Sequence, residues 1–214
     1  MSTYPIYQVD AFTNTVFGGN PAAVVPLDAW LPDEVMQKIA VENNLSETAF
    51  FVPSSKGYHL RWFTPTYEID LCGHATLGTS HVILNELYPD QESVTFETNV
   101  SGDLIVTKSD NGLEMDFPSL APEPMALDDV PDAVLEGLHH PEVIEAHISK
   151  NKKIVMTLKN EQAVRDLDPN YSTLLGYPSS VIATAISTDP KYDFVSRNFC
   201  AYDFSIQEDP VTGS

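Results

Sequence analysis

The sequence predicts an α+β protein built from two similar domains, each a curved mixed or antiparallel sheet wrapped around a central helix. The first observation is an internal repeat, because residues 68–74 (EIDLCGH) align with residues 208–214 (EDPVTGS). The second is that an Arg-x-Phe triplet precedes each copy, at residues 61–63 and 197–199. The third is the segment 75–87, whose apolar and small residues are typical of a helix buried on most sides. Two such pseudo-symmetric units predict two domains that face each other across one cleft.

Composition argues against several functional classes. The chain has 214 residues, 43% of them hydrophobic, and no run of about 18 apolar residues that could span a membrane. Its net charge of −20 would repel phosphate backbones and anionic lipid surfaces, so neither nucleic acid nor membrane is an expected partner. The start of the chain lacks a secretory pattern and two cysteines make no disulfide framework, which predicts a reduced, cytoplasmic protein. Without a Cys-x-x-Cys motif, and with scattered histidines, no metal site is expected.

The elements of the first half follow from periodicity and turn residues. A helix begins within 28–34, where a proline and acids form the first turn, and Asn43-Asn44 can end it. The segment 75–87 is the central helix, and the turn at 109–112 joins two strands into a hairpin. Alternating or continuous apolar runs predict strands at 4–12, 22–25, 48–52, 58–63, 93–97, 103–107 and 112–117.

The second half repeats this organisation after a proline-rich segment. Residues 118–131 carry four prolines among acidic and small residues, so we place the domain boundary there, with domains at 1–118 and 119–214. The chain ends at Ser214, where the first half would begin its central helix, so the second domain is expected to be incomplete at its C-terminus. Helices are expected at 132–138 and near 161–166, and strands at 143–148, 153–158, 181–186 and 192–199.

The junction at Gly73-His74 is the first candidate for function. A strand ends there, a glycine permits a tight turn, and a helix begins, so unpaired amides and the positive end of the helix dipole point outward. Such a helix start can bind a carboxylate. The alternative is an ordinary strand–helix junction in which His74 caps its own helix. The second copy at Gly213-Ser214 favours binding, because two opposed helix starts could hold one anion.

Two carboxylates are candidate acid–base groups. Glu47 stands at the mouth of the apolar strand 48–52, and withdrawal from water would let it take and return a proton near neutral pH. An exposed carboxylate at a strand start is the alternative. Asp209 competes for the same role, because it precedes a proline, which favours an extended or turn conformation, beside the second helix start.

Cys72 leaves two interpretations open. A helix N-terminus favours the thiolate, so Cys72 could act as a nucleophile or base, but cysteine is also a common small core residue. The remaining histidines show no ligand spacing and are expected to be structural or exposed: His59, His81, His139, His140 and His147.

Seven short motifs occur along the chain in a characteristic order and spacing. They are VDAF at 9–12, GNPAAV at 19–24, NLSET at 44–48, FTPT at 63–66, CGHATLGT at 72–79, DFVSR at 193–197 and EDPVTGS at 208–214. In this combination the chain resembles the PhzF family, the phenazine-biosynthesis isomerases. The resemblance implies a diaminopimelate-epimerase-like fold with its site between two domains. It also implies a cofactor-free isomerase, usually a homodimer, acting on a small carboxylate substrate.

The resemblance also implies roles for individual residues. The family's type reaction moves a proton within a dihydro-hydroxyanthranilate ring, and the glutamate of the Ser-Glu-Thr motif, here Glu47, is the family's acid–base. The positions of His74, Asp209 and Ser214 match residues that orient or hydrogen-bond the substrate. The candidate site residues are Glu47, His74 and Asp209 for catalysis, and Asn20, Gly73, Gly213 and Ser214 for substrate binding.

Three functional hypotheses remain. The first is an isomerase in which Glu47 removes a proton alpha or vinylogous to an unsaturated acid and returns it elsewhere. The second is an amino-acid epimerase or racemase that uses Cys72 with another base. Related racemases carry a cysteine in each repeat, whereas Thr212 stands at the second position here, and its hydroxyl is a poor base toward carbon acids. The third is a non-catalytic module that binds a carboxylate.

Overall fold

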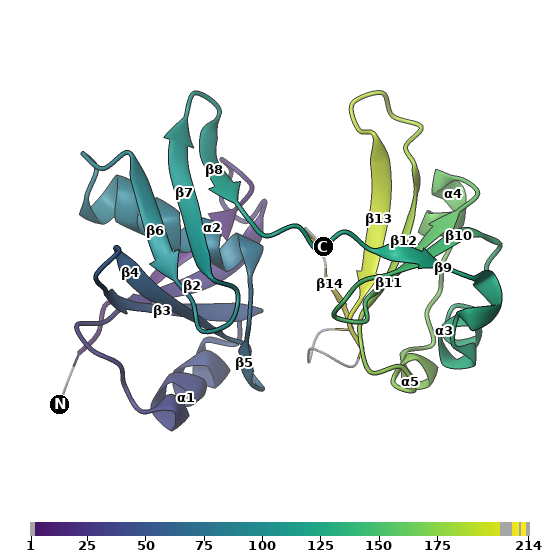
Figure 1. Cartoon of the computed structure of the whole chain (residues 1–214), viewed down its shortest axis with the longest axis horizontal. Helices are drawn as coiled ribbons and strands as arrows, with labels where there is room; N and C mark the ends of the chain where they lie inside the picture. The colour runs from purple at the N-terminus through teal and green to yellow at the C-terminus, as the bar shows by residue number, and fades with distance from the viewer. Residues whose placement is uncertain (1–2, 202–206, 210, 213–214) are drawn as a thin grey trace. The chain divides into compact units, whose positions relative to one another are not determined.

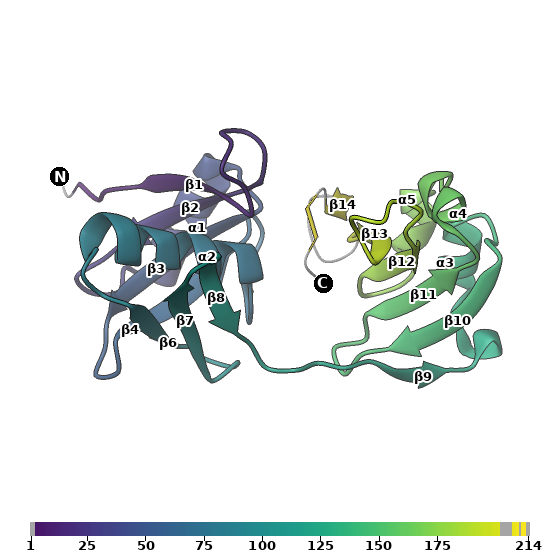
Figure 2. The same ribbon diagram turned by 90° about the horizontal axis from the view of Figure 1, so that it is seen from above.

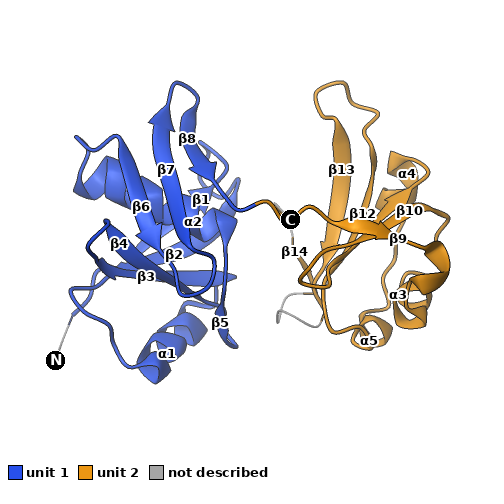
Figure 3. Cartoon of the chain, in the orientation of Figure 1, with its two compact units in different colours: residues 1–118, 213 blue, residues 119–212, 214 orange. Residues whose placement is uncertain are grey.

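The structure is a computed structural model that describes residues 3–201, 207–209 and 211–212. The chain divides into two compact units, residues 1–118 (unit 1) and 119–212 (unit 2), which Figure 3 colours separately. Each unit is a β-sheet with helices packed on it, so the predicted α+β class is confirmed. No helix in the described ranges is long and apolar enough to cross a membrane.

Unit 1 is built on one mixed sheet. Its strands are β1 (Tyr7–Ala11), β2 (Asn20–Pro26), β3 (Glu47–Pro53), β4 (Tyr58–Phe63), β5 (Glu68–Ile69), β6 (Ser93–Glu97), β7 (Asp103–Ser109) and β8 (Gly112–Asp116). Their order is β1-β2-β3-β4-β6-β7-β8, and β5 also pairs with β4. The pairs β2/β3 and β4/β6 are parallel, and the other neighbours are antiparallel.

The sheet of unit 1 curls around helix α2 (Gly73–His81), as Figures 1 and 2 show. This helix packs against β1, β2 and β3 near one end of the sheet and against β8 at the other. Its buried hydroxyls are satisfied within the helix, because Thr76, Thr79 and Ser80 donate to the carbonyls four residues earlier at 2.5–2.8 Å. A helix with polar groups satisfied in this way can be buried on most sides, as the composition predicted.

The opposite face of the same sheet carries helix α1 (Asp33–Asn43), which contacts β3 and β4. Met36 and Ala40 of α1 are fully buried against Phe50 and other apolar residues of the strands. Asn44 ends the helix in the left-handed conformation, with φ 50° and its N–H donating to the Ala40 carbonyl. Asparagine tolerates this conformation better than most residues, so the predicted helix end is confirmed.

Unit 2 contains a second mixed sheet with its core on one face. Its elements are β9 (Glu123–Met125), a 3₁₀ turn η2 (Leu127–Asp129), α3 (Asp132–Gly137), β10 (Val143–Ile148), β11 (Ile154–Leu158), α4 (Glu161–Arg165), α5 (Tyr171–Leu174), β12 (Val181–Ile186), β13 (Phe194–Phe199) and β14 (Glu208–Asp209). The strand order is β14-β13-β12-β11-β10-β9. Among the described strands of this sheet, β11 and β12 pair in parallel and the other neighbours are antiparallel. Apolar residues of α3, α4 and α5 pack with inward residues of β10 to β13.

The two units share one strand-pairing pattern. The pairings along β1-β2-β3-β4-β5 are antiparallel, parallel, antiparallel and antiparallel, and those along β10-β11-β12-β13-β14 follow the same sequence. The register repeats as well, because Phe63 lies opposite Glu68 and Phe199 lies opposite Glu208. The repeat read from the sequence is therefore a repeat of local structure.

Three expectations about elements need correction. The strand expected at 4–12 is the shorter β1, and Phe12 just after it has a φ of 65°, which ends extended structure. The helix expected at 75–87 is α2 followed by a π-helical segment, η1 (Val82–Leu87). The proline-rich segment 118–131 is not merely a linker, because it contains β9, which pairs with β10.

Candidate active site

Glu47 is the first residue of β3 and is buried. It lies opposite Ala22 of the parallel strand β2, and only 6% of its surface is exposed. The alternative of an exposed carboxylate at a strand start is therefore wrong. A carboxylate withdrawn from water is retained only where a polar partner faces it, so the group opposite Glu47 matters.

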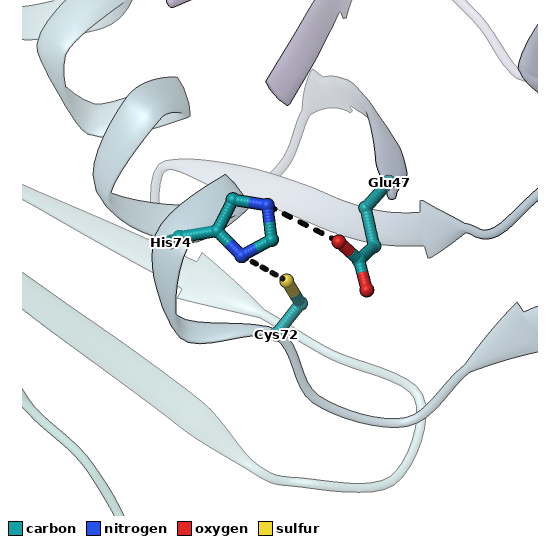
Figure 4. Close-up of side chains that lie close together, drawn as sticks. All are labelled: Glu47, Cys72 and His74. Atoms are coloured by element: carbon teal, nitrogen blue, oxygen red, sulfur yellow. Dashed lines mark hydrogen bonds and ion pairs between the residues drawn. The ribbon is translucent and has the colours of Figure 1, made fainter. Parts of the chain in front are cut away.

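That group is the imidazole of His74, in the first turn of α2. Glu47 Oε2 lies 3.1 Å from His74 Nε2, and His74 Nδ1 lies 3.5 Å from Cys72 Sγ (Figure 4). Cys72 is the residue just before α2, in extended conformation, and is 7% exposed. Both ring nitrogens thus face side chains, so the alternative in which His74 only caps its own helix is wrong.

The Glu47–His74 pair has no competing polar contacts at its meeting point. Glu47 Oε2 and His74 Nε2 lie 3.1 Å apart, and neither atom has a hydrogen-bonding partner among the described residues. A neutral imidazole carries one N–H donor and one bare nitrogen, and a carboxylate oxygen is an acceptor, so the two unsatisfied atoms can each engage a group of a reacting molecule. The arrangement can therefore accept a proton from a reacting molecule and release it again.

The three side chains also satisfy the proximity expected of metal ligands, since one ligand atom of each lies within 4.8 Å of the others. Figure 4 shows, however, that the imidazole lies between its neighbours and turns a different nitrogen to each. A chelating site needs one nitrogen to converge on an ion together with the sulfur and the carboxylate, about 2.0–2.3 Å from each ligand atom. The imidazole therefore lies between the thiol and the carboxylate, with one nitrogen toward each.

Gly73 leaves the space in front of α2 open. Among the described residues, a Cβ added to it would meet only Phe117, at 3.8 Å, and its backbone is not left-handed. The glycine permits the turn, but the backbone conformation there does not require one. Its effect is to leave room beside the first amides of the helix, which have no carbonyl partner within it.

The other predicted residues are placed as follows. Asn20 is the first residue of β2, is 2% exposed, and lies two residues before Ala22, the partner of Glu47. Asp209 is in β14 of unit 2, where its carboxylate accepts the Val211 N–H at 3.1 Å. Gly213 and Ser214 lie outside the described residues.

A buried polar residue that the sequence analysis missed is Asn198, which is 2% exposed in β13. Its Nδ2 donates to Thr212 Oγ1 at 3.2 Å, and Thr212 is the counterpart of Cys72 in the repeat. Asn198 is the middle residue of the second Arg-x-Phe triplet, and its place in this repeated motif is the sequence feature that could have identified it.

The strands that lead into the two repeat turns are held by equivalent ion pairs. Arg61 donates from Nε and Nη2 to the two carboxylate oxygens of Glu68 at 2.7 and 2.6 Å, and Arg197 makes the same pair of bonds to Glu208, both at 2.7 Å. The Arg197 hydrogen bonds hold the pKa of Glu208 below its ordinary value. Two parallel bonds fix orientation as well as distance. Each of these two-bond pairs, called here the Arg61 fork and the Arg197 fork, therefore sets the position of β5 or β14.

The profile of the PhzC-PhzF family, described as phenazine biosynthesis-like protein, matches residues 9–214. The chain belongs to this family. An uncharacterised isomerase from Pseudomonas aeruginosa is 46% identical over 209 residues, which are 98% of this chain and 77% of the relative. A crystal structure of a PhzF-family protein from Enterococcus faecalis has a TM-score of 0.84 and 44% identity, covering 99% of this chain and 78% of that one.

The fold extends to more distant proteins. A structure described as a predicted epimerase from Pseudomonas aeruginosa has a TM-score of 0.70 at 19% identity, covering 99% of this chain and 78% of that chain. That likeness concerns the fold alone and confirms the expected epimerase-like architecture. Its curated relatives are named isomerases, and this PhzF-family chain is an isomerase on that basis.

Proposed function

We propose that this protein is a cofactor-independent isomerase that moves a proton within a small cyclic unsaturated amino- or hydroxycarboxylic acid, with Glu47 as the acid–base. The observation that carries the proposal is the Glu47 carboxylate, 6% exposed and 3.1 Å from His74 Nε2. Neither of the two facing atoms has another polar partner among the residues that the structure describes. The pair is therefore available to a substrate proton.

The chemistry needs no co-reactant. Glu47 takes a proton from a carbon alpha or vinylogous to the substrate carboxylate, and the electrons of that C–H bond enter the conjugated system. The same carboxylic acid then returns the proton to a different carbon, so the product is an isomer. His74 orients Glu47 in both steps, and the proton held on Glu47 between them can exchange with solvent, so deuterated water labels the product.

The start of α2 supports recognition of a carboxylate. This helix is nine residues long, and its first amides point away from the helix with the positive end of its dipole. Because Gly73 has no side chain, a ligand can approach them. A carboxylate bound there would place the rest of a small ring beside the first turn, which also carries His74.

The test is to incubate the protein with a dihydro-hydroxyanthranilate in deuterated water and follow the ring protons by NMR. We expect isomerisation with deuterium at the new position, and a loss of rate of about 10²- to 10⁴-fold in Glu47→Gln. Glu42→Gln is the matched control, because Glu42 is exposed on α1 and the chemical change is the same. Near-full activity in Glu47→Gln would contradict the assignment.

An epimerase that uses Cys72 is the second candidate, favoured by the 3.5 Å contact between its thiol and His74. Cys72→Ala would then abolish activity while Glu47→Gln is tolerated. A carboxylate-binding module is the third possibility. It would show saturable binding of a cyclic carboxylate without exchange of any substrate proton.

We further propose a homodimer, as the family resemblance implies. Light scattering would then give twice the 23.6 kDa of the chain. A mass equal to that of one chain across the concentration range would contradict the proposal.

A further inference from the structure

We propose that Cys72 is a positioning residue that fixes the tautomer of His74 and so keeps Glu47 ready as a base. The thiol, the imidazole and the carboxyl group form one relay in which the proton at one end sets the proton at the other. The inference rests on the proposed role of Glu47 and assigns a function to a thiol that the isomerase mechanism does not itself use.

The contacts of the relay lie within one unit and on rigid elements. Cys72 is attached to α2 through its backbone, because its carbonyl accepts the Thr76 N–H at 3.3 Å and the Thr76 hydroxyl at 2.5 Å. Its thiol is therefore held beside His74 Nδ1, and His74 Nε2 faces Glu47 at the start of β3. All three side chains are buried, so water does not readily replace either contact.

The proton positions follow from the donors available. In the proposed relay the protonated thiol donates to Nδ1, and the neutral imidazole then carries its own proton on Nε2. That N–H then faces Glu47 Oε2, 3.1 Å away, and its positive end favours the carboxylate form that acts as the base. When the thiol loses its proton, Nδ1–H donates to the sulfur instead, and the bare Nε2 turns its lone pair toward Glu47 Oε2. The protonation of the Cys72 thiol therefore decides whether His74 presents an N–H or a bare nitrogen to Glu47.

Few other titratable groups on the surrounding elements could produce the same effect. Besides His74, the titratable residue of α2 is His81, in the last turn. The titratable residue of β3 is Glu47 itself. Strand β2 carries none, and β8 carries two exposed acids, Glu114 and Asp116. On β1, Tyr7 packs on the core around α2, and Asp10 accepts the Phe17 N–H at 2.8 Å. None of these groups is seen in contact with His74 Nδ1, whereas the Cys72 thiol lies 3.5 Å from it.

The second repeat differs at the position of Cys72. Thr212 stands where unit 1 has Cys72, and its hydroxyl accepts a hydrogen bond from the Asn198 amide. A hydroxyl and an amide do not change charge in the physiological range, so that position cannot switch a neighbouring imidazole. A titrating thiol in unit 1 is thus a specific feature of the first copy.

The decisive experiment reads the tautomer directly and needs no substrate. Long-range ¹H–¹⁵N NMR of the ¹⁵N-labelled chain distinguishes the two neutral forms of histidine, and His74→Asn identifies the His74 signals by their loss. We expect wild type and Cys72→Ser to show the Nε2–H form, because both retain a donor, and Cys72→Ala to show a mixture. We also expect the His74 signals of wild type, but not of Cys72→Ser, to change as thiols ionise at alkaline pH.

The same tautomer in wild type and in a folded Cys72→Ala would overturn the proposal, and so would an Nδ1–H form in wild type at neutral pH. Cys200→Ser removes the other thiol of the chain, in unit 2, and should leave the His74 signals unchanged. Cys72→Ser retains a donor in nearly the same volume, so the proposal can still be tested if Cys72→Ala folds poorly.

Turnover separates this inference from the proposed function. With active enzyme, Cys72→Ala should lower kcat about 10- to 100-fold with little change in KM, and Cys72→Ser should recover most of that loss. Cys72→Ser should also remove the alkaline limb of the kcat–pH profile that the thiol produces in wild type. The expected tautomers without turnover would leave the relay standing and remove the proposed substrate. Loss of kcat with an unchanged His74 tautomer would show instead that Cys72 reacts directly.

Discussion

Glu161 illustrates how one buried carboxylate can join distant segments. It is the first residue of α4 and is 7% exposed. Its Oε2 accepts both the Thr188 N–H and the Thr188 hydroxyl at 2.6 Å, and its Oε1 accepts Arg165 Nε at 2.8 Å. These bonds, with those from Thr188 first, lower the pKa of Glu161 from 4.5 to about 2. The carboxylate form is thus favoured by folding.

The sign of this shift predicts a pH dependence of stability. A carboxyl group whose pKa is lower when folded stabilises the protein above its unfolded pKa, and this contribution is lost as the pH falls through the folded pKa. Glu161→Gln should therefore be less stable than wild type at pH 7. The two free energies of unfolding should converge as the pH falls from about 4.5 to about 2.

Far-UV circular dichroism in denaturant is the suitable measurement, because both tryptophans, Trp30 and Trp62, lie in unit 1 and do not report on α4. Glu136→Gln is the control, since Glu136 is an exposed residue of α3 in the same unit. A constant difference between Glu161→Gln and wild type across this pH range would show that Glu161 does not stabilise through its charge.

At the scale of elements, Gly78 lies where α2 packs against the sheet. A Cβ at this position would lie 3.5 Å from the Val9 Cβ and 3.9 Å from the Ala22 Cβ, which are ordinary contacts. Gly78→Ala should therefore be tolerated, with up to about 1 kcal/mol gained from helix propensity. Gly78→Leu would overfill the interface with β1 and β2 and should lose about 1–3 kcal/mol.

Tryptophan fluorescence in urea measures both Gly78 variants, because the buried Trp62 lies in the same core cluster as the strands under α2. The alanine variant serves as the control for loss of the glycine itself. Equal stability of Gly78→Leu and Gly78→Ala would mean that the helix is not packed closely at this position.

The Arg61 fork joins three elements of unit 1. Besides Glu68 of β5, the guanidinium contacts Asp33 at the start of α1, at 2.9 Å, and its side chain is only 11% exposed. Arg61→Met should lose about 1–3 kcal/mol, because charged hydrogen bonds are broken in a half-buried setting. Lys56→Met is the comparison, since Lys56 forms an exposed pair with Asp103 that should contribute under about 1 kcal/mol. Equal losses in urea titrations of the two variants would show that burial of the Arg61 fork adds nothing.

These elements also show what sequence could and could not predict. Strands at 58–63, 93–97, 143–148 and 181–186 match the structure residue for residue, because their apolar pattern and bounding turns are local. Strands β5, β9 and β14 and helix α5 were missed, because segments of two to four residues have no readable period. They form through tertiary partners, as the Arg61–Glu68 fork does for β5.

The candidate site shows the same division between local and long-range information. Glu47, His74 and Cys72 were each singled out from their local setting. Their mutual contact depends on how α2 lies across β3, which is a long-range packing property that no window of sequence contains. The burial of Glu47 likewise depends on its place beside β2, not on its immediate neighbours.

At the scale of the whole molecule, the buried apolar residues form clusters that belong to one unit each. The two clusters of unit 1 lie on the two faces of its sheet, and the cluster of unit 2 lies under α3, α4 and α5. A unit with its own core can fold by itself when it is large enough, and 118 residues is within the usual domain range of roughly 50–200. We therefore propose that the units are independent folding domains.

The prediction is that residues 1–118 expressed alone form a cooperatively folded protein. Trp30 and Trp62 would report a single urea transition, because they belong to the two clusters on opposite faces of one sheet. The fragment should also retain the His74 tautomer of the full chain, since Glu47, His74 and Cys72 all lie in unit 1. It should not isomerise the substrate if Asp209 takes part in catalysis. A fragment with near-native helix content but no cooperative transition would show that unit 1 needs unit 2 to order its core. The two units would then be separate in structure but would fold as one cooperative unit.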